Sequence, residues 1–85
     1  MSEDPYFDIA NKLEGKLVKK YGLDGVDFRY VDISSPEVLE YIDEVSTIVE
    51  NRLPLPYVSI NGSPVSWGID DAEEIFIKIV NFLNL

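Results

Sequence analysis

The sequence contains no cysteine and no histidine among its 85 residues. Without cysteine, the chain has no disulfide, no thiol nucleophile and no thiolate ligand for a metal ion. Without histidine, it lacks the commonest general base and the commonest zinc ligand. Residue identity alone therefore excludes most of the side-chain chemistry that enzymes use.

Basic residues are also scarce, and long apolar runs are absent. Seven Lys and Arg residues stand against 16 Asp and Glu residues, which gives a net charge of -9. This charge repels phosphate backbones and anionic lipid, so nucleic acid and membranes are poor partners. No run approaches the roughly 18 apolar residues that span a bilayer, and residues 1–10 lack the features of a secretory signal. The sequence thus predicts a soluble, cytoplasmic protein.

The remaining composition is that of a globular protein. Hydrophobic residues make up 46% of the chain and charged residues 27%, which are ordinary values for a folded domain. A chain of this length buries one small core. No linker, internal repeat or low-complexity run divides it, so residues 1–85 are predicted to form a single domain.

Two apolar patterns fill the first part of the chain. From Tyr6 to Tyr21, apolar side chains recur three and four residues apart, which predicts an amphipathic helix that ends at Gly22. From Val26 to Ile33, the segment VDFRYVDI alternates apolar and polar residues and is rich in β-branched and aromatic side chains. This alternation predicts a β-strand.

A second helix is predicted to begin at Ser35 and Pro36. The Ser35 hydroxyl suits an N-cap, and Pro36 loses no hydrogen bond in the first helical position. The helix must end by Leu53, because a residue that precedes proline is disfavoured in helical geometry. One face of this helix is apolar and consists of Val38, Leu39, Ile42, Val45, Ile48 and Val49.

A hairpin follows. Short strands are predicted over Tyr57–Ile60 and from about Val65 to Trp67. Between them stands Asn61-Gly62, a dipeptide that favours a tight turn. Pro64 places the returning strand at a sheet edge, because proline cannot donate to a ladder.

The last helix opens with acidic residues. Either Asp70 with Glu73, or Asp71 with Glu74, has the spacing of a capping pair. A broad apolar face follows, made of Ile75, Phe76, Ile79, Val80, Phe82 and Leu83. The predicted order is therefore helix, strand, helix, strand, strand, helix.

Four short motifs stand in a characteristic order. They are Asp4-Pro5-Tyr6-Phe7 with Ala10 behind it, then Pro56, then Asn61-Gly62, then Gly68-Ile69-Asp70-Asp71. Together they resemble the thioredoxin superfamily, and glutaredoxins in particular, in which Cys-Pro-Tyr-Cys, a cis-proline, Asn-Gly and Gly-Cys-Asp-Asp follow one another. The resemblance covers essentially the whole chain from Asp4. It implies an α/β, thioredoxin-like α-β-α-β-β-α fold with helices packed on a small mixed sheet.

The chain also departs from that family. Asp4, Phe7 and Ile69 stand where the family has cysteines, so its thiol chemistry cannot operate. The family's first strand has no counterpart, since only Met1-Ser2-Glu3 precede the first motif. Three explanations stay open: the remaining strands pair among themselves, a second copy or another chain supplies a strand, or the sequence is a fragment.

The resemblance also implies candidate binding residues. In the family positions, glutathione or a peptide would be bound by Tyr6, Leu55, Pro56 in cis, Ile69, Asp70 and Asp71. Simple helix capping is the alternative role of the two aspartates. Tyr57 and Trp67 are predicted to contact a partner, with core packing as the alternative. The acidic residues lack the spacing of a calcium loop, so we expect neither a metal nor another cofactor.

Two functions remain open. The first is a redox-inactive protein-binding or scaffold module, not an enzyme, that holds a protein partner or a second copy at the sheet edge. The second is a glutathione-binding enzyme or sensor of the glutaredoxin or glutathione-transferase type, in which Tyr6 or Tyr57 would supply a hydroxyl beside the thiol. Because the chain is strongly acidic and has no basic residue before Lys12, anionic glutathione is a weak guest. We therefore predict the first function.

Overall fold

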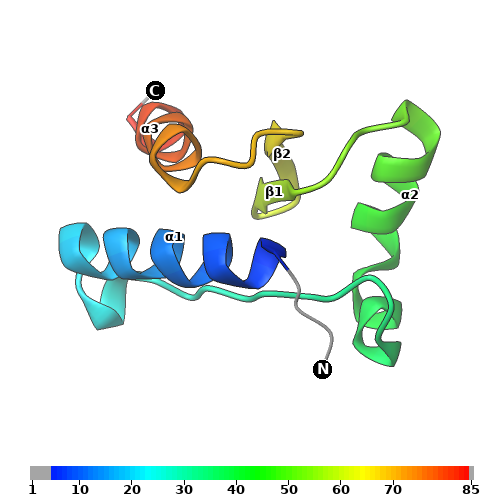
Figure 1. The fold of residues 1–85 in the computed structure, drawn as a ribbon, viewed down its shortest axis with the longest axis horizontal. Helices are drawn as coiled ribbons and strands as arrows, with labels where there is room; N and C mark the ends of the chain where they lie inside the picture. The colour runs from blue at the N-terminus through cyan, green and yellow to red at the C-terminus, as the bar shows by residue number, and fades with distance from the viewer. Residues whose placement is uncertain (1–4, 85) are drawn as a thin grey trace. The chain divides into compact units, whose positions relative to one another are not determined.

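The computed structural model describes residues 5–84, which adopt a mixed α/β structure (Figure 1). Within these residues there are three α-helices and one antiparallel sheet of two strands. In chain order the elements are α1 (Pro5–Tyr21), η1 (Leu23–Gly25), η2 (Pro36–Tyr41), α2 (Ile42–Asn51), β1 (Tyr57–Ile60), β2 (Ser63–Trp67) and α3 (Ala72–Leu83), where η marks a 3-10 helix. They form two compact units, residues 5–30 with 70–84 and residues 31–69.

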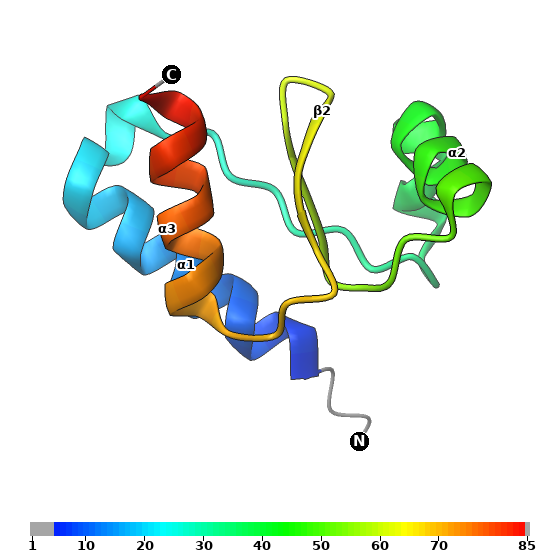
Figure 2. The same ribbon diagram turned by 90° about the horizontal axis from the view of Figure 1, so that it is seen from above.

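In the first unit α1 packs against α3, and the two helices cross (Figure 2). Apolar side chains three and four residues apart on each helix meet in a small core, because that spacing places them on one helical face. The core consists of Ala10, Leu13, Leu17, Ala72, Ile75 and Ile79, all of which are buried. The predicted first and last helices are thus confirmed.

Gly22 ends α1 as predicted. Its φ angle of 81° lies in the left-handed region, and its N–H donates to the carbonyl of Val18 at 2.7 Å. Glycine adopts this conformation without steric cost, which is why it commonly follows the last turn of a helix.

In the second unit the predicted second helix is divided into two parts. Pro36 begins the 3-10 helix η2, and the α-helical hydrogen bonds of α2 begin only at Ile42. The Ser35 hydroxyl does not cap it; it donates to the carbonyl of Asp32 at 2.8 Å instead. The helix ends before Leu53 as predicted, since Arg52 adopts a left-handed conformation and its N–H bonds back to Ile48 and Val49.

The predicted hairpin is confirmed. β1 and β2 pair antiparallel, with Tyr57 opposite Trp67 and Ile60 opposite Ser63. The turn residues Asn61 and Gly62 have φ angles of 51° and 83°, the positive values that a two-residue turn of this kind requires. β2 begins at Ser63, two residues earlier than predicted, and so includes Pro64.

The predicted strand over Val26–Ile33 is wrong. Val26 has extended backbone angles, with φ −131° and ψ 125°, but within residues 5–84 this segment joins no sheet. A strand is stable only where a neighbouring strand accepts and donates its ladder hydrogen bonds, and alternation in the sequence cannot supply that neighbour. The sheet is therefore antiparallel and two-stranded, not the small mixed sheet that the resemblance implies.

Candidate functional site

The six predicted ligand-binding residues are divided between the two units. The first unit holds Tyr6, Asp70 and Asp71, and the second holds Leu55, Pro56 and Ile69. The aspartates are exposed, and the other four side chains are half-buried. Both predicted partner-contact residues, Tyr57 and Trp67, lie in the second unit as a directly opposed pair on the hairpin.

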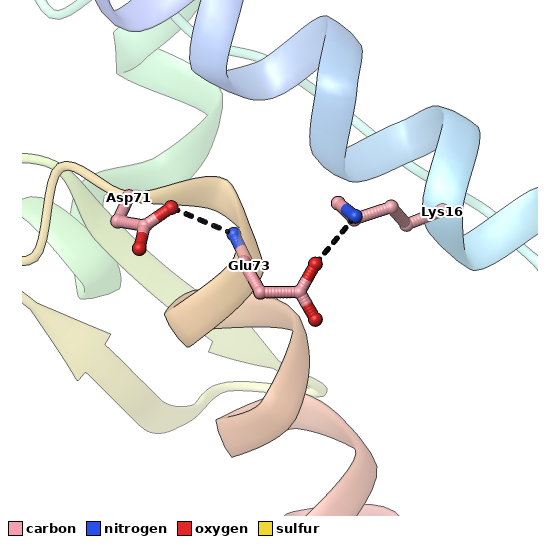
Figure 3. A network of polar contacts seen from close by, with 3 residues as sticks. All are labelled: Lys16, Asp71 and Glu73. Atoms are coloured by element: carbon pink, nitrogen blue, oxygen red, sulfur yellow. Dashed lines mark hydrogen bonds and ion pairs between the residues drawn. The ribbon is translucent and has the colours of Figure 1, made fainter.

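Asp71 is the N-cap of α3. Its carboxylate accepts a hydrogen bond from the N–H of Glu73 at 3.1 Å (Figure 3). The Glu73 carboxylate in turn pairs with the Lys16 ammonium of α1 at 2.6 Å. Because the Lys16 side chain is 38% exposed and that of Glu73 58%, solvent screens the pair, and it contributes at most about 1 kcal/mol. The contacts of Asp71 are therefore those of a helix cap, which is the alternative role that the sequence suggests for it.

The N-terminal motif lies partly outside the described residues, since Asp4 is not among them. Phe7, which the resemblance aligns with the family's second cysteine, is 50% exposed on α1. Its ring meets Tyr30 edge-on, with ring centroids 5.7 Å apart. The motif position is thus occupied by an aromatic contact between a helix and the extended segment that follows η1.

At the base of the hairpin, Pro54, Pro56 and Gly68 lie close together. The Leu55–Pro56 peptide bond is cis, which confirms that expectation. The Pro56 carbonyl accepts from the N–H of Gly68 at 3.1 Å. Gly68 has a φ angle of 75°, and a Cβ at this position would stand 2.7 Å from Cγ of Pro54. Only glycine therefore fits here without a shift of its neighbours.

The side chains around the hairpin differ in exposure. Trp67 is 44% exposed, so it is not a buried core residue. Burial raises the pKa of the Tyr57 hydroxyl, and the nearby Glu44 carboxylate raises it further. Glu44 also accepts a hydrogen bond from the Ser59 hydroxyl at 2.9 Å, which ties α2 to β1.

The two outer edges of the hairpin are not equivalent. The bond between Gly68 and Pro56 makes these residues a hydrogen-bonded pair, so the next pair, Tyr57 and Trp67, points its backbone N–H and C=O groups outward. At the other end, the two-residue turn makes Ser59 and Pro64 the outward-pointing pair. Tyr57 and Ser59 thus present complete backbone groups on the edge of β1.

The edge of β2 is blunted. Pro64 occupies an outward-pointing position and has no N–H to offer. The register also shifts between Val58 and Ser59, so β2 carries an extra residue opposite that step. Proline and a bulge are two of the devices by which natural sheets block further strand pairing. The open edge is therefore that of β1.

Glu44 and Ser59 were not predicted as site residues. The signal for Ser59 was present, because it is a polar residue in the otherwise apolar and aromatic strand YVSI. Its partner Glu44 is one of several carboxylates on its helix, and sequence alone did not distinguish it from them.

No protein-family model, curated protein or solved structure matches this chain. Among residues 5–84, no group of three or more acidic side chains could hold a metal ion. In the same part of the chain, no helix is both long enough and apolar enough to cross a membrane.

Proposed function

We propose that this protein is a redox-inactive, thioredoxin-like binding module that takes up an extended segment of a protein partner along the open edge of β1. The single observation that carries this proposal is the outward-pointing backbone of Tyr57 and Ser59, beside a second edge that Pro64 blocks. An edge of this kind binds an added strand through main-chain hydrogen bonds. The partner is a second protein or a second copy of this chain.

The side chains at the same place supply contact surface. Trp67 is exposed at the base of the hairpin, and Leu55 and Tyr57 are half-buried there. Tryptophan and tyrosine are enriched among the residues that dominate binding energies, because their rings contribute a large contact area. The absence of cysteine supports the redox-inactive part of the proposal. The resemblance in the order of motifs supports the thioredoxin-like part.

The test uses amide NMR spectra of the whole chain with two probes. One probe is a peptide of alternating valine and threonine with lysine at both ends, which favours an extended conformation. The other is glutathione at a concentration of about 1 mM, near the limit of weak binding. We expect the peptide to shift the amides of Tyr57 and Ser59 and to slow their hydrogen exchange, and we expect glutathione to shift nothing.

Two variants of one residue separate the backbone from the side chain. Ser59→Pro removes an outward N–H without removing a ladder bond, and it should abolish peptide binding. Ser59→Ala loses the same contact with Glu44 but keeps the N–H, and it should retain binding. Binding that survives Ser59→Pro contradicts the edge mechanism. Glutathione shifts at Leu55, Ile69 and Asp70 would favour the glutathione-using function instead.

A further inference from the structure

A second surface lies on α2, away from the residues of the proposed edge. Glu44 directs one side of this helix toward β1 through its bond to the Ser59 hydroxyl. At 3.6 residues per turn, Ile48 shares that side, whereas Ile42, Val45 and Val49 lie along a different side. One side of the helix, with Ile48, thus faces β1, and the apolar side with Ile42, Val45 and Val49 faces elsewhere.

The side formed by Ile42, Val45 and Val49 is exposed at both ends and half-buried at Val45. Ile42 is 52% exposed and Val49 is 68% exposed, and Leu39, just ahead of the helix, is 68% exposed. No described residue of η2 or α2 is buried. A helix in a folded protein ordinarily buries such a stripe, and a cluster of exposed apolar residues marks an interaction site. We call Leu39, Ile42, Val45 and Val49 the α2 stripe.

Carboxylates accompany the α2 stripe. Between Pro36 and Asn51 there are five acidic residues and no basic one. Glu37, Glu40, Asp43 and Glu50 are exposed, and Glu44 is half-buried. The first basic residue is Arg52, beyond the last turn. A ligand of the stripe thus meets a negative field from the same two elements.

We infer that the α2 stripe binds a basic amphipathic helix of a partner protein. The apolar side chains of such a helix would cover the stripe, and its lysine and arginine residues would face the surrounding carboxylates. Charge complementarity selects this occupant, because it accelerates association and disfavours partners of like charge. A second copy would bring a second net charge of -9 and the same acidic residues, and anionic lipid would also be repelled.

The size of the stripe fits a short helix. The ten residues of α2 extend about 15 Å at a rise of about 1.5 Å per residue. A partner helix of about three to four turns covers that length, and its anchors are then apolar residues three and four positions apart. Such a partner buries a small area, so the interaction belongs to the weak and salt-sensitive class.

The experiment measures binding of synthetic peptides to the whole chain by calorimetry and amide NMR. The probe has about 14 residues, with leucine three and four positions apart and lysine elsewhere. One control peptide keeps the leucines and replaces each lysine by glutamate. A second control keeps the composition and scrambles the leucine positions. We expect only the probe to bind, with shifts at the amides of Ile42, Val45 and Val49.

Variants of the protein test both parts of the surface. Val49→Ser should raise the dissociation constant of the probe about tenfold, because it removes the most exposed apolar side chain of α2. Glu40→Gln with Glu50→Gln should raise it severalfold, as should about 1 M salt, at which the screening length is about 3 Å. Ile77→Ser and Glu14→Gln, at exposed positions on α3 and α1, should leave it unchanged.

Several results would overturn the inference. Equal binding of the scrambled peptide would show that charge attraction alone, without the leucine spacing, explains the interaction. Equal binding of the glutamate peptide would show that the carboxylates around the stripe do not select the partner. Self-association that Val49→Ser abolishes would assign the stripe to a second copy. Shifts confined to Tyr57 and Ser59 would assign the probe to the edge of β1. Ser59→Pro blocks that edge and changes no residue of the stripe. Because Ser59→Ala controls for the lost contact with Glu44, the two surfaces can fail independently.

Discussion

The two units differ in where they place their apolar residues. Every buried apolar side chain among the described residues belongs to the first unit, at the contact between α1 and α3. In the second unit the one buried residue is Ser66, while Leu39, Ile42 and Val49 are more than half exposed. The first unit thus holds the buried core, whereas the second unit leaves these apolar side chains exposed. We therefore expect stability to come mainly from the first unit, and we propose that binding uses the second.

The largest expected effect tests whether the first unit carries the stability. Ile75 is 1% exposed, and Ile75→Ala should lower the free energy of unfolding by about 2–5 kcal/mol through lost burial and a residual cavity. Ile42→Ala, in the second unit, should change it by less than about 0.5 kcal/mol, because Ile42 is already half exposed. Urea unfolding followed by circular dichroism measures both values.

Two further variants support this measurement. If Ile75→Ala does not fold, Ile75→Val should still show a loss of about 0.5–1.5 kcal/mol. Ile77→Ala is the control on the same helix, since Ile77 is 48% exposed and should tolerate the change. If Ile42→Ala lowered the free energy of unfolding as much as Ile75→Ala, stability would not be concentrated in the first unit.

The next effect concerns backbone geometry in the second unit. Gly68→Ala should cost about 1–3 kcal/mol, because the new side chain would occupy a positive φ and approach Pro54. Gly15→Ala is the counterpart in the first unit. Gly15 lies in the middle of α1 with open space around it, so that change should stabilise the chain by about 0.5–1 kcal/mol. Thermal unfolding measures both effects: Tm should fall for Gly68→Ala and rise for Gly15→Ala.

A smaller effect decides between the two capping pairs that the sequence offers. Asp71→Ala should destabilise α3 by about 1 kcal/mol, since it leaves the Glu73 N–H without its acceptor. Asp70→Ala removes the same charge one residue earlier but breaks no cap, and it should fall within about 0.5 kcal/mol of the parent chain. Equal losses of stability in both variants would show that the removed negative charge, and not the cap, causes the effect.

The smallest effect is a dependence on pH in the second unit. The folded state raises the pKa of Tyr57, through burial first and Glu44 second, so folding disfavours the phenolate. The corresponding stability is complete below the ordinary tyrosine pKa of about 10 and is lost as the pH rises through the folded value. Tyr57→Phe should make the fall in Tm above pH 10 shallower. An unchanged slope would mean that Tyr57 ionises as freely in the folded chain as in the unfolded one.

The sequence predicted local structure better than pairing. The Gly22 stop, the Asn61-Gly62 turn and the end of α2 before Leu53 depend on a few neighbouring residues, and all three are confirmed. The strand over Val26–Ile33 depends on a partner far along the chain, and it fails for that reason. Side-chain exposure still alternates from Val26 to Tyr30. The sequence pattern thus predicted which side chains are more buried, but not that the segment lacks a strand to pair with.

The candidate site shows the same limit. Tyr57 and Trp67 were each predicted to contact a partner, and the hairpin places them directly opposite each other. The contact between Glu44 and Ser59 joins residues from two elements, and no local spacing encodes it. The ligand-binding residues taken from the family resemblance lie partly in each unit, and they stay a prediction.

Pro64 has a consequence for how far assembly of this chain can proceed. A hairpin with two open edges can add copies on both sides and grow without limit into a fibre. Here Pro64 and the register shift hinder pairing on the side of β2, so the proposed addition takes place on the side of β1. Under the proposed edge mechanism, two copies that met edge to edge through β1 would satisfy each other and would form a closed symmetric pair. If the proposed edge is used, we expect the same residue that marks an edge strand to limit assembly to a single addition.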